Sequence, residues 1–162
     1  MIPDRIIPTP PPGWTWKNLM AEALAEAGKA RELGEVPIGA VLVEADGTII
    51  GRGHNQPVSS HNPAAHAEIM AICAAASRKQ NYRLNGAVLL VTLEPCLMCA
   101  GAIVHARLDG VVYGAKDPKA GVVESRLDGL DLNFHNHRVW HMGGILEAEC
   151  AAILDDFFRE RR

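Results

Sequence analysis

The sequence has no excess of positive charge, no long apolar run and few cysteines, and each of these absences excludes a class of protein. Its 162 residues carry a net charge of −3, so any contact with nucleic acid must be local rather than spread over the whole surface. It contains no stretch of about 18 consecutive apolar residues, which argues against a membrane-spanning helix. The first residues show no basic-then-apolar signal pattern, so we expect a soluble, cytoplasmic protein.

The four cysteines are arranged for metal binding rather than for disulfides. Cys96 and Cys99 form a C-x2-C pair, a spacing that in an intracellular protein more often marks a metal site. A second such pair, which a zinc ribbon would need, is absent from the sequence. Cys73 and Cys150 stand in apolar helical contexts, where we expect them to pack as small core residues.

A histidine and a glutamate complete the pattern, as His66-Ala67-Glu68. The potential ligands His66, Cys96 and Cys99 leave one position open for water, as catalytic zinc sites do, whereas structural sites are closed by four ligands. Glu68 is too close to His66 in sequence to be a further ligand, but it can take a proton from that water and pass it to a substrate. A redox C-x-x-C pair would leave His66 and Glu68 unexplained. The pattern therefore predicts a catalytic Zn²⁺ site, one per subunit.

The composition predicts one globular domain preceded by a short tail. Hydrophobic residues make up 48% and charged residues 22% of the chain, which is ordinary globular usage. Residues 1–13 contain Pro3, Pro8, Pro10, Pro11 and Pro12. We expect this tail to be poorly ordered and residues 14–162 to form a single domain.

Apolar periodicity and turn residues predict an alternation of strands and helices. We expect strands at 38–43, 48–53, 87–92 and 111–113, and helices at 16–33 (capped by Thr15), 64–77, 96–106 and 145–161. The type of the segment 138–141 remains open. His66 and both cysteines of the pair fall in first helical turns, so two helix N-termini would point their partial positive charge at the metal. The order predicts an α/β fold, one sheet with helices packed over it.

Segments in and beyond the metal motif carry a second signal. H-x-E…P-C-x-x-C alone identifies only the superfamily of zinc-dependent nucleobase deaminases. Seven segments can be compared with known families: Glu35–Val41, Pro63–Met70, Asn81–Leu84, Val91–Ala102, Tyr113–Asp117, Asn136–Val139 and Ile145–Arg159. Together they resemble bacterial-type tRNA-specific adenosine deaminases over about residues 19–159. The NYRL and DFFR segments single out this tRNA branch of the superfamily.

This resemblance implies a fold and a reaction. The implied fold is a three-layer α/β/α sandwich around a five-stranded mixed sheet, of the cytidine-deaminase type, usually in a homodimer. The implied reaction is hydrolysis of the wobble adenosine (position 34) of a tRNA anticodon loop to inosine, with release of ammonia. His66, Cys96 and Cys99 would hold zinc, and Glu68 would shuttle protons.

The resemblance also implies substrate-binding residues. Asn55 would bind the flipped base, which suits an amide that both donates and accepts hydrogen bonds. Asp117 lies in the loop where the family approaches the substrate nucleotide. Phe157, Phe158 and Arg159 could bind RNA, because aromatic rings stack on bases and arginine pairs with phosphates; which phenylalanine faces RNA remains open.

Two other functions stay open from the residues alone. A deaminase of a free nucleobase or nucleoside, of the guanine, cytosine or cytidine type, would use the same metal motif, and the acidic net charge slightly favours it. A non-catalytic, zinc-stabilised RNA-binding subunit would not need Glu68. The segment 122–126 is bulkier and more charged than is expected for the tRNA family, which leaves the conformation of its loop open.

Overall fold

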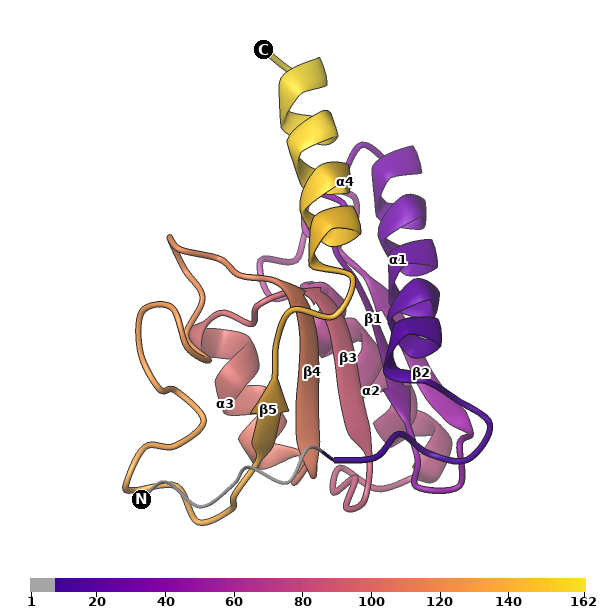
Figure 1. Ribbon diagram of the computed structural model, residues 1–162, viewed down its shortest axis with the longest axis vertical. Coiled ribbons are helices and arrows are strands. Elements are labelled where there is room, and N and C mark those ends of the chain that lie inside the picture. Colours follow the sequence, from indigo (N-terminus) through magenta and orange to yellow (C-terminus); the bar gives the residue numbers. More distant parts are fainter. Residues whose placement is uncertain (1–7) are drawn as a thin grey trace.

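The computed structural model, which describes residues 8–162, places helices on both faces of one five-stranded mixed sheet (Figure 1). The strands are β1 (Gly39–Val43), β2 (Ile49–His54), β3 (Val88–Leu93), β4 (Gly110–Ala115) and β5 (Trp140–Met142). The helices are α1 (Trp16–Glu32), α2 (Ala67–Lys79), α3 (Leu97–His105) and α4 (Glu147–Glu160). The strand order is β2-β1-β3-β4-β5. The predicted three-layer α/β/α architecture is confirmed.

The open segment near residue 140 is the fifth strand, and three helices, α2, α3 and α4, begin one to three residues later than predicted. α2 starts at Ala67 rather than at residue 64, because the Asn62 side chain accepts the Ala64 N–H in a turn, 3.0 Å away, and delays the helix. His66 is therefore the residue that caps α2, and Cys96 is the residue that caps α3. The predicted first-turn placement is wrong by one residue for each, while Cys99 does lie in the first turn of α3.

The direction of the strands brings several strand ends together. β1 is antiparallel to both β2 and β3, whereas β3 pairs in parallel with β4, and β4 with β5. The carboxyl ends of β2, β3, β4 and β5 consequently lie at one edge of the sheet. Asn55 follows β2 there, Pro95 and Cys96 follow β3, and Asp117 follows β4. The carboxyl ends of strands are where open α/β sheets bind ligands.

Each face of the sheet is buried under its own pair of helices. Figure 1 shows α1 and α4 on the near face and α2 behind the sheet. On β3, Leu89 packs into the cluster that includes α2 and α3, whereas the next residue, Leu90, packs into the cluster of α1 and α4. Both side chains are fully buried. A strand buried on both faces reads as a continuous apolar run, as this one does.

The α2 backbone rests directly on β2 because two residues of that strand have no side chain. A Cβ atom at Gly53 would lie 2.4 Å from the Ala67 carbonyl oxygen and 2.5 Å from the Ala71 nitrogen. At Gly51 it would lie 2.3 Å from the Ala71 carbonyl oxygen. This close approach sets the position of the start of α2, and with it the position of His66.

The predicted tail falls partly outside the described residues, which begin at Pro8. The Trp16 indole N–H donates to the Pro8 carbonyl at 2.9 Å, and the Trp14 indole N–H donates to the Gly47 carbonyl at 2.8 Å. Pro11 is buried. These contacts tie residues 8–13 to the start of α1 and to the turn between β1 and β2.

Two further expectations concern the surface and the core. No helix within residues 8–162 combines the length and apolar character needed to cross a membrane. Cys150 is a buried core residue as expected, but Cys73 is exposed, because it lies on the outer side of α2. The prediction that both cysteines are buried is therefore wrong for Cys73.

We predict opposite effects for two glycine substitutions. Gly53→Ala forces a Cβ atom into the α2 backbone and should lower the free energy of unfolding by about 2–3 kcal/mol. Gly28→Ala, inside α1 with open space around its Cβ position, should raise it by about 0.5–1 kcal/mol, since alanine favours the helix. Chemical denaturation measures both, and a Gly53→Ala protein as stable as the original would contradict the close contact of α2 with β2.

Candidate metal centre and active site

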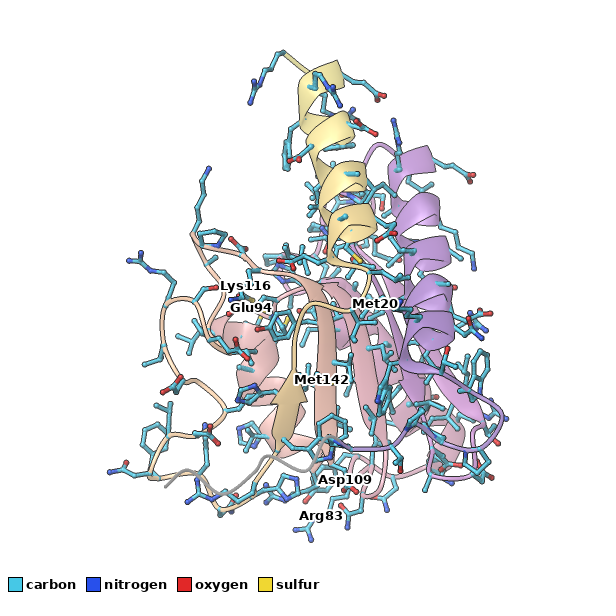
Figure 2. All side chains as sticks on the ribbon, in the orientation of Figure 1. Met20, Arg83, Glu94, Asp109, Lys116 and Met142 are labelled. Carbon is cyan, nitrogen blue, oxygen red and sulfur yellow. The ribbon has the colours of Figure 1, made fainter. Side chains whose placement is uncertain are left out.

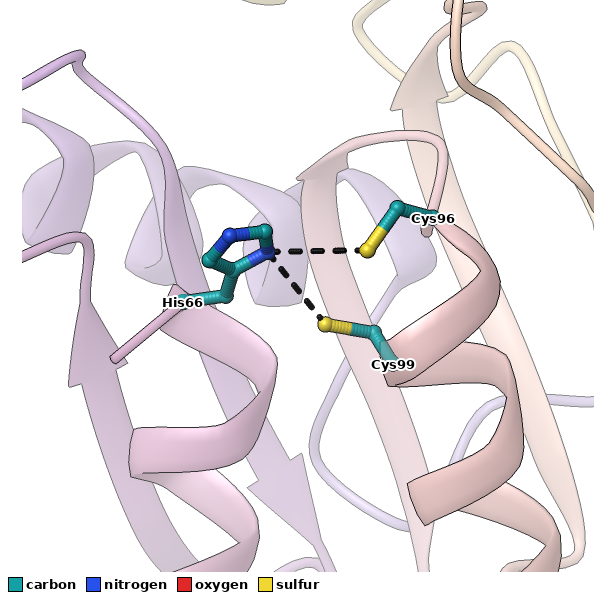
Figure 3. A group of neighbouring side chains, drawn as sticks. All are labelled: His66, Cys96 and Cys99. Atoms are coloured by element: carbon teal, nitrogen blue, oxygen red, sulfur yellow. Dashed lines mark hydrogen bonds between the residues drawn. The ribbon is translucent and has the colours of Figure 1, made fainter. Parts of the chain in front are cut away.

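Three of the predicted site residues converge at the starts of two helices. The His66 Nδ1 atom lies 3.6 Å from the Cys96 Sγ atom and 3.6 Å from the Cys99 Sγ atom (Figure 3). Their ligand atoms all lie within 4.8 Å of one another. Separated by some thirty positions in the sequence, these side chains form a cluster that could hold a metal ion.

The two residues that cap α2 and α3 have their side chains free for this cluster. His66 and Cys96 both have extended backbone conformations, and neither makes a side-chain hydrogen bond to its own helix. α2 and α3 lie on the same face of the sheet. Their N-termini bring partial positive charge to the cluster, which favours anionic sulfur.

The pKa values of the two thiols are shifted in opposite directions. The Cys99 thiol donates a hydrogen bond to Cys96; together with the Cys99 backbone N–H and the nearby His66, and against the effect of burial, this lowers the pKa of Cys96 to about 5. The pKa of Cys99 is raised, because its proton is held in that hydrogen bond and its sulfur is buried. One thiolate is thus present at neutral pH, and a bound metal ion would displace the second proton.

Glu68 is buried beside this cluster. It lies in the first turn of α2 and is 4% exposed. Burial raises the pKa of its carboxyl group, against the lowering effects of its own backbone N–H and of the Cys99 thiol. A buried carboxyl group beside a potential metal site is typical of a residue that accepts and returns a proton.

Asn55 brings an amide to the same edge of the sheet. Its backbone N–H donates to the Ile38 carbonyl, and the next N–H, of Gln56, donates to the carbonyl of Ala65, each at 3.0 Å. The second bond places Asn55 beside the residue that precedes His66. The side chain is 7% exposed, and its Oδ1 atom has no hydrogen-bond partner within the described part of the chain. A buried acceptor without a partner is costly, which is typical of a site that a ligand completes.

The carboxylate of Asp117 is engaged in its own loop. Its Oδ1 atom accepts the N–H groups of Lys119 at 3.0 Å and Ala120 at 3.2 Å. Asp117 lies at the carboxyl end of β4, as predicted, but its side chain also shapes the turn that follows.

The C-terminal aromatic pair is divided between core and surface. Phe157 is 3% exposed and lies under the Arg161 guanidinium, 3.7 Å from its ring centroid. Phe158 is 48% exposed. The Arg159 side chain is 71% exposed and pairs with Asp156. Burial argues against the predicted RNA contact of Phe157, whereas Phe158 and Arg159 face solvent.

Two buried glutamates to which the sequence gave no role lie near the carboxyl ends of β2 and β3. Glu35 is 2% exposed and accepts the N–H groups of Val58, at 3.2 Å, and Ser59, at 2.7 Å, in the loop after Asn55. Glu94, also 2% exposed, directly precedes Pro95 and accepts N–H groups of the loop after β4. The one signal in the sequence for Glu94 is a charged residue that directly follows an apolar strand.

We predict that Cys99→Ser weakens metal binding and that Cys73→Ser does not. Removal of one ligand should lower the affinity for Co²⁺ by at least about tenfold and reduce the thiolate–cobalt absorption. Cys73 is an exposed cysteine of α2 outside the cluster, which makes it the matched control. Equal cobalt spectra for Cys99→Ser and the original protein would contradict the assignment.

Comparisons with known proteins identify the family of this chain. The MafB19-like deaminase family matches residues 14–162. The tRNA-specific adenosine deaminase of Haemophilus influenzae is 47% identical over 146 residues, covering 90% of this chain and 84% of that protein. That of Bacillus subtilis is 49% identical over 143 residues, with 88% of each chain covered. A solved structure from studies of A-to-I editing by tRNA:A34 deaminases at the wobble position superposes with a TM-score of 0.81 at 46% identity, covering 85% of this chain and 99% of that one. The chain therefore belongs to the family of tRNA-specific adenosine deaminases.

Proposed function

We propose that this protein hydrolyses the 6-amino group of the wobble adenosine, position 34, in a tRNA anticodon loop, giving inosine and ammonia. The observation that supports this function is the cluster of His66, Cys96 and Cys99 beside the buried Glu68, in a chain whose relatives, matched along most of their length, are named tRNA-specific adenosine deaminases. A single-stranded loop suits the reaction, because its bases can be splayed out at little cost.

The metal ion in this proposal is Zn²⁺, one per subunit. A tetrahedral ion with Zn–N of about 2.0–2.1 Å and Zn–S of about 2.3 Å sets its nitrogen and sulfur ligands about 3.6 Å apart. Both Nδ1–Sγ distances in the cluster are 3.6 Å. Two thiolates and an imidazole also suit zinc and exclude the oxygen-seeking Mg²⁺ and Ca²⁺. When bound, zinc would supply a polarised water molecule at the position that the three residues leave open.

Glu68 and Asn55 would act on the proton and on the base. Glu68 would take a proton from the attacking water and return it to the substrate, so that the amino group leaves as ammonia. The buried Asn55 Oδ1 atom, which has no partner among the described residues, would accept a hydrogen bond from the base, and the amide NH₂ would donate one. Both side chains are pre-positioned by burial.

The RNA contacts in this proposal are local, as the net charge requires. A groove of about 680 Å³ is lined by Lys119, Phe158, Arg159, Arg161 and Arg162, and among the described residues by one acidic side chain, Asp155. It joins the end of α4 to the loop that carries Asp117. Phe158 would stack on a base and Arg159 would bind a phosphate, while Asp117 would border the nucleotide.

We further propose a cytoplasmic homodimer. The start of α3 exposes two apolar side chains, Leu97 at 60% and Met98 at 40%. Phe134, which is 76% exposed, lines a groove of about 440 Å³ together with Leu97. A second copy of the chain would cover this apolar surface, which is unusual for a monomer in solution.

A deaminase of free nucleobases or nucleosides is the less favoured alternative. It would share the metal chemistry, since substrate choice depends on the pocket and its surroundings. However, relatives at 47% and 49% identity along most of the chain are tRNA-specific enzymes.

The direct test is to incubate the zinc-loaded protein with a tRNA that carries adenosine at position 34. We expect inosine at that position, and none in the same tRNA with cytidine-34, because a pyrimidine lacks the 6-amino group of a purine. Free adenosine, guanine and cytidine serve as parallel substrates. Ammonia from a free base or nucleoside, with no inosine in tRNA, would overturn the proposed function.

We also predict that Glu68→Ala abolishes turnover without releasing metal or RNA. Loss of general acid–base catalysis should lower kcat by about 10²–10⁴-fold or more. Zinc content and tRNA affinity should stay unchanged, since Glu68 is not among the clustered ligands. Glu32→Ala, at the exposed end of α1, is the matched control. Inosine formation at an undiminished rate by the Glu68→Ala protein would show that another group moves the proton.

A further inference from the structure

A second buried carboxylate, that of Glu94, lies in the short segment of chain that connects the sheet to the first cysteine of the metal cluster. Glu94 follows β3 and precedes Pro95 and Cys96. Its own N–H donates to the Ala115 carbonyl at the end of β4, at 2.9 Å, which fixes its backbone. Figure 2 shows Glu94 close to Lys116, where the chain leaves β4. Among the described residues, Glu94 is not part of the cluster that could hold a metal ion.

The Glu94 carboxylate accepts hydrogen bonds from a single loop. Its Oε1 atom accepts the Asp117 N–H at 3.1 Å and the Ser125 hydroxyl. Its Oε2 atom accepts the N–H groups of Val123, Glu124 and Ser125, at 3.1, 2.9 and 2.9 Å. These five hydrogen bonds use the whole accepting capacity of a carboxylate. In each of them the loop donates and Glu94 accepts.

The loop is packed around this side chain without spare room. A Cβ atom at Gly121 would lie 2.4 Å from the Glu94 carboxyl carbon. The Val122 N–H donates to the Pro95 carbonyl at 3.0 Å, so the loop also contacts the turn that carries Cys96. The five hydrogen bonds and this close packing hold the Glu94 side chain in one position between the loop and the turn that carries Cys96.

We propose that Glu94 is a positioning residue of this deaminase, whose carboxylate holds the loop 117–125 as a wall of the substrate site and keeps it in register with the Cys96 turn. This role rests on the proposed function, because it assigns the loop to that reaction. Glu94 acts through backbone N–H groups rather than through substrate. The side chains of the loop can therefore change while its backbone path is kept.

The test compares Glu94→Gln, Glu94→Asp and Glu26→Gln in the zinc-loaded full chain. Glutamine replaces one accepting oxygen by an NH₂ group that faces N–H donors, so the loop should detach. We expect kcat/KM for adenosine-34 tRNA to fall by about 10²-fold at unchanged zinc content, as for a misplaced positioning group. Glu94→Asp, which keeps the charge on a shorter stem, should give an intermediate kcat/KM. Glu26 is equally buried, at 3% exposed, but it pairs with the side chains of Lys29, Arg52 and His54 rather than with loop N–H groups, so Glu26→Gln should stay within about twofold.

Hydrogen exchange at individual amides provides a readout that a change in global stability alone would not alter. In Glu94→Gln and, to a smaller extent, in Glu94→Asp, the amides of residues 123–125 should exchange at least about tenfold faster, with those of β3 and β4 unchanged. Unaltered exchange at 123–125 would overturn the proposal, as would an equal loss of kcat/KM in Glu26→Gln. If the original protein made no inosine, the proposed function would fail, whereas the exchange measurement would still decide whether Glu94 holds the loop.

Discussion

The close contact between the α2 backbone and the glycines of β2 is the constraint on which the site depends. Because Gly51 and Gly53 carry no side chain, α2 lies directly on its strand, and the helix begins where the carboxyl ends of the strands meet. α3 starts at the same edge on the same face. The cluster of His66, Cys96 and Cys99 follows from these two helix positions and does not require any one loop to bring distant ligands together.

The site is assembled at a cost that the rest of the fold offsets. Glu68 and Asn55 are polar groups held almost without exposure, and the Asn55 Oδ1 atom has no partner among residues 8–162. Neither is favourable by itself, because buried polar groups lose their hydration. Two apolar clusters, one on each face of the sheet, supply the opposing stability. A folded state that tolerates such groups at one edge is typical of a site prepared for a ligand.

The sequence predicted the elements and the convergence of His66, Cys96 and Cys99 better than the contacts made by loops. Short apolar strands and capped helices are local signals, and the spacing of a metal motif is read directly. The segment near Trp140 could not be assigned, because a strand of three residues at a sheet edge has too little periodicity. The role of Glu94 was not predicted, since its five donors come from residues that lie 23 to 31 positions away. The burial of Phe157 but not of Phe158 likewise depends on how α4 is rotated against the domain.

The connection between β4 and β5 shows why buried anchors are needed at this edge. Parallel strands are usually joined by a helix, which satisfies its own backbone hydrogen bonds, whereas here a long irregular segment makes the crossover. Loops of this length are uncommon and are usually functional. The Glu94 carboxylate accepts the backbone N–H groups of the first part of this loop. Farther along, the ring Nε2 atoms of His135 and His137 donate to the carbonyls of Gly129, at 2.8 Å, and Leu108, at 2.7 Å. An irregular crossover anchored by side chains can change its sequence without moving its backbone, and substrate preference can therefore diverge in this loop while the metal chemistry beneath it is kept.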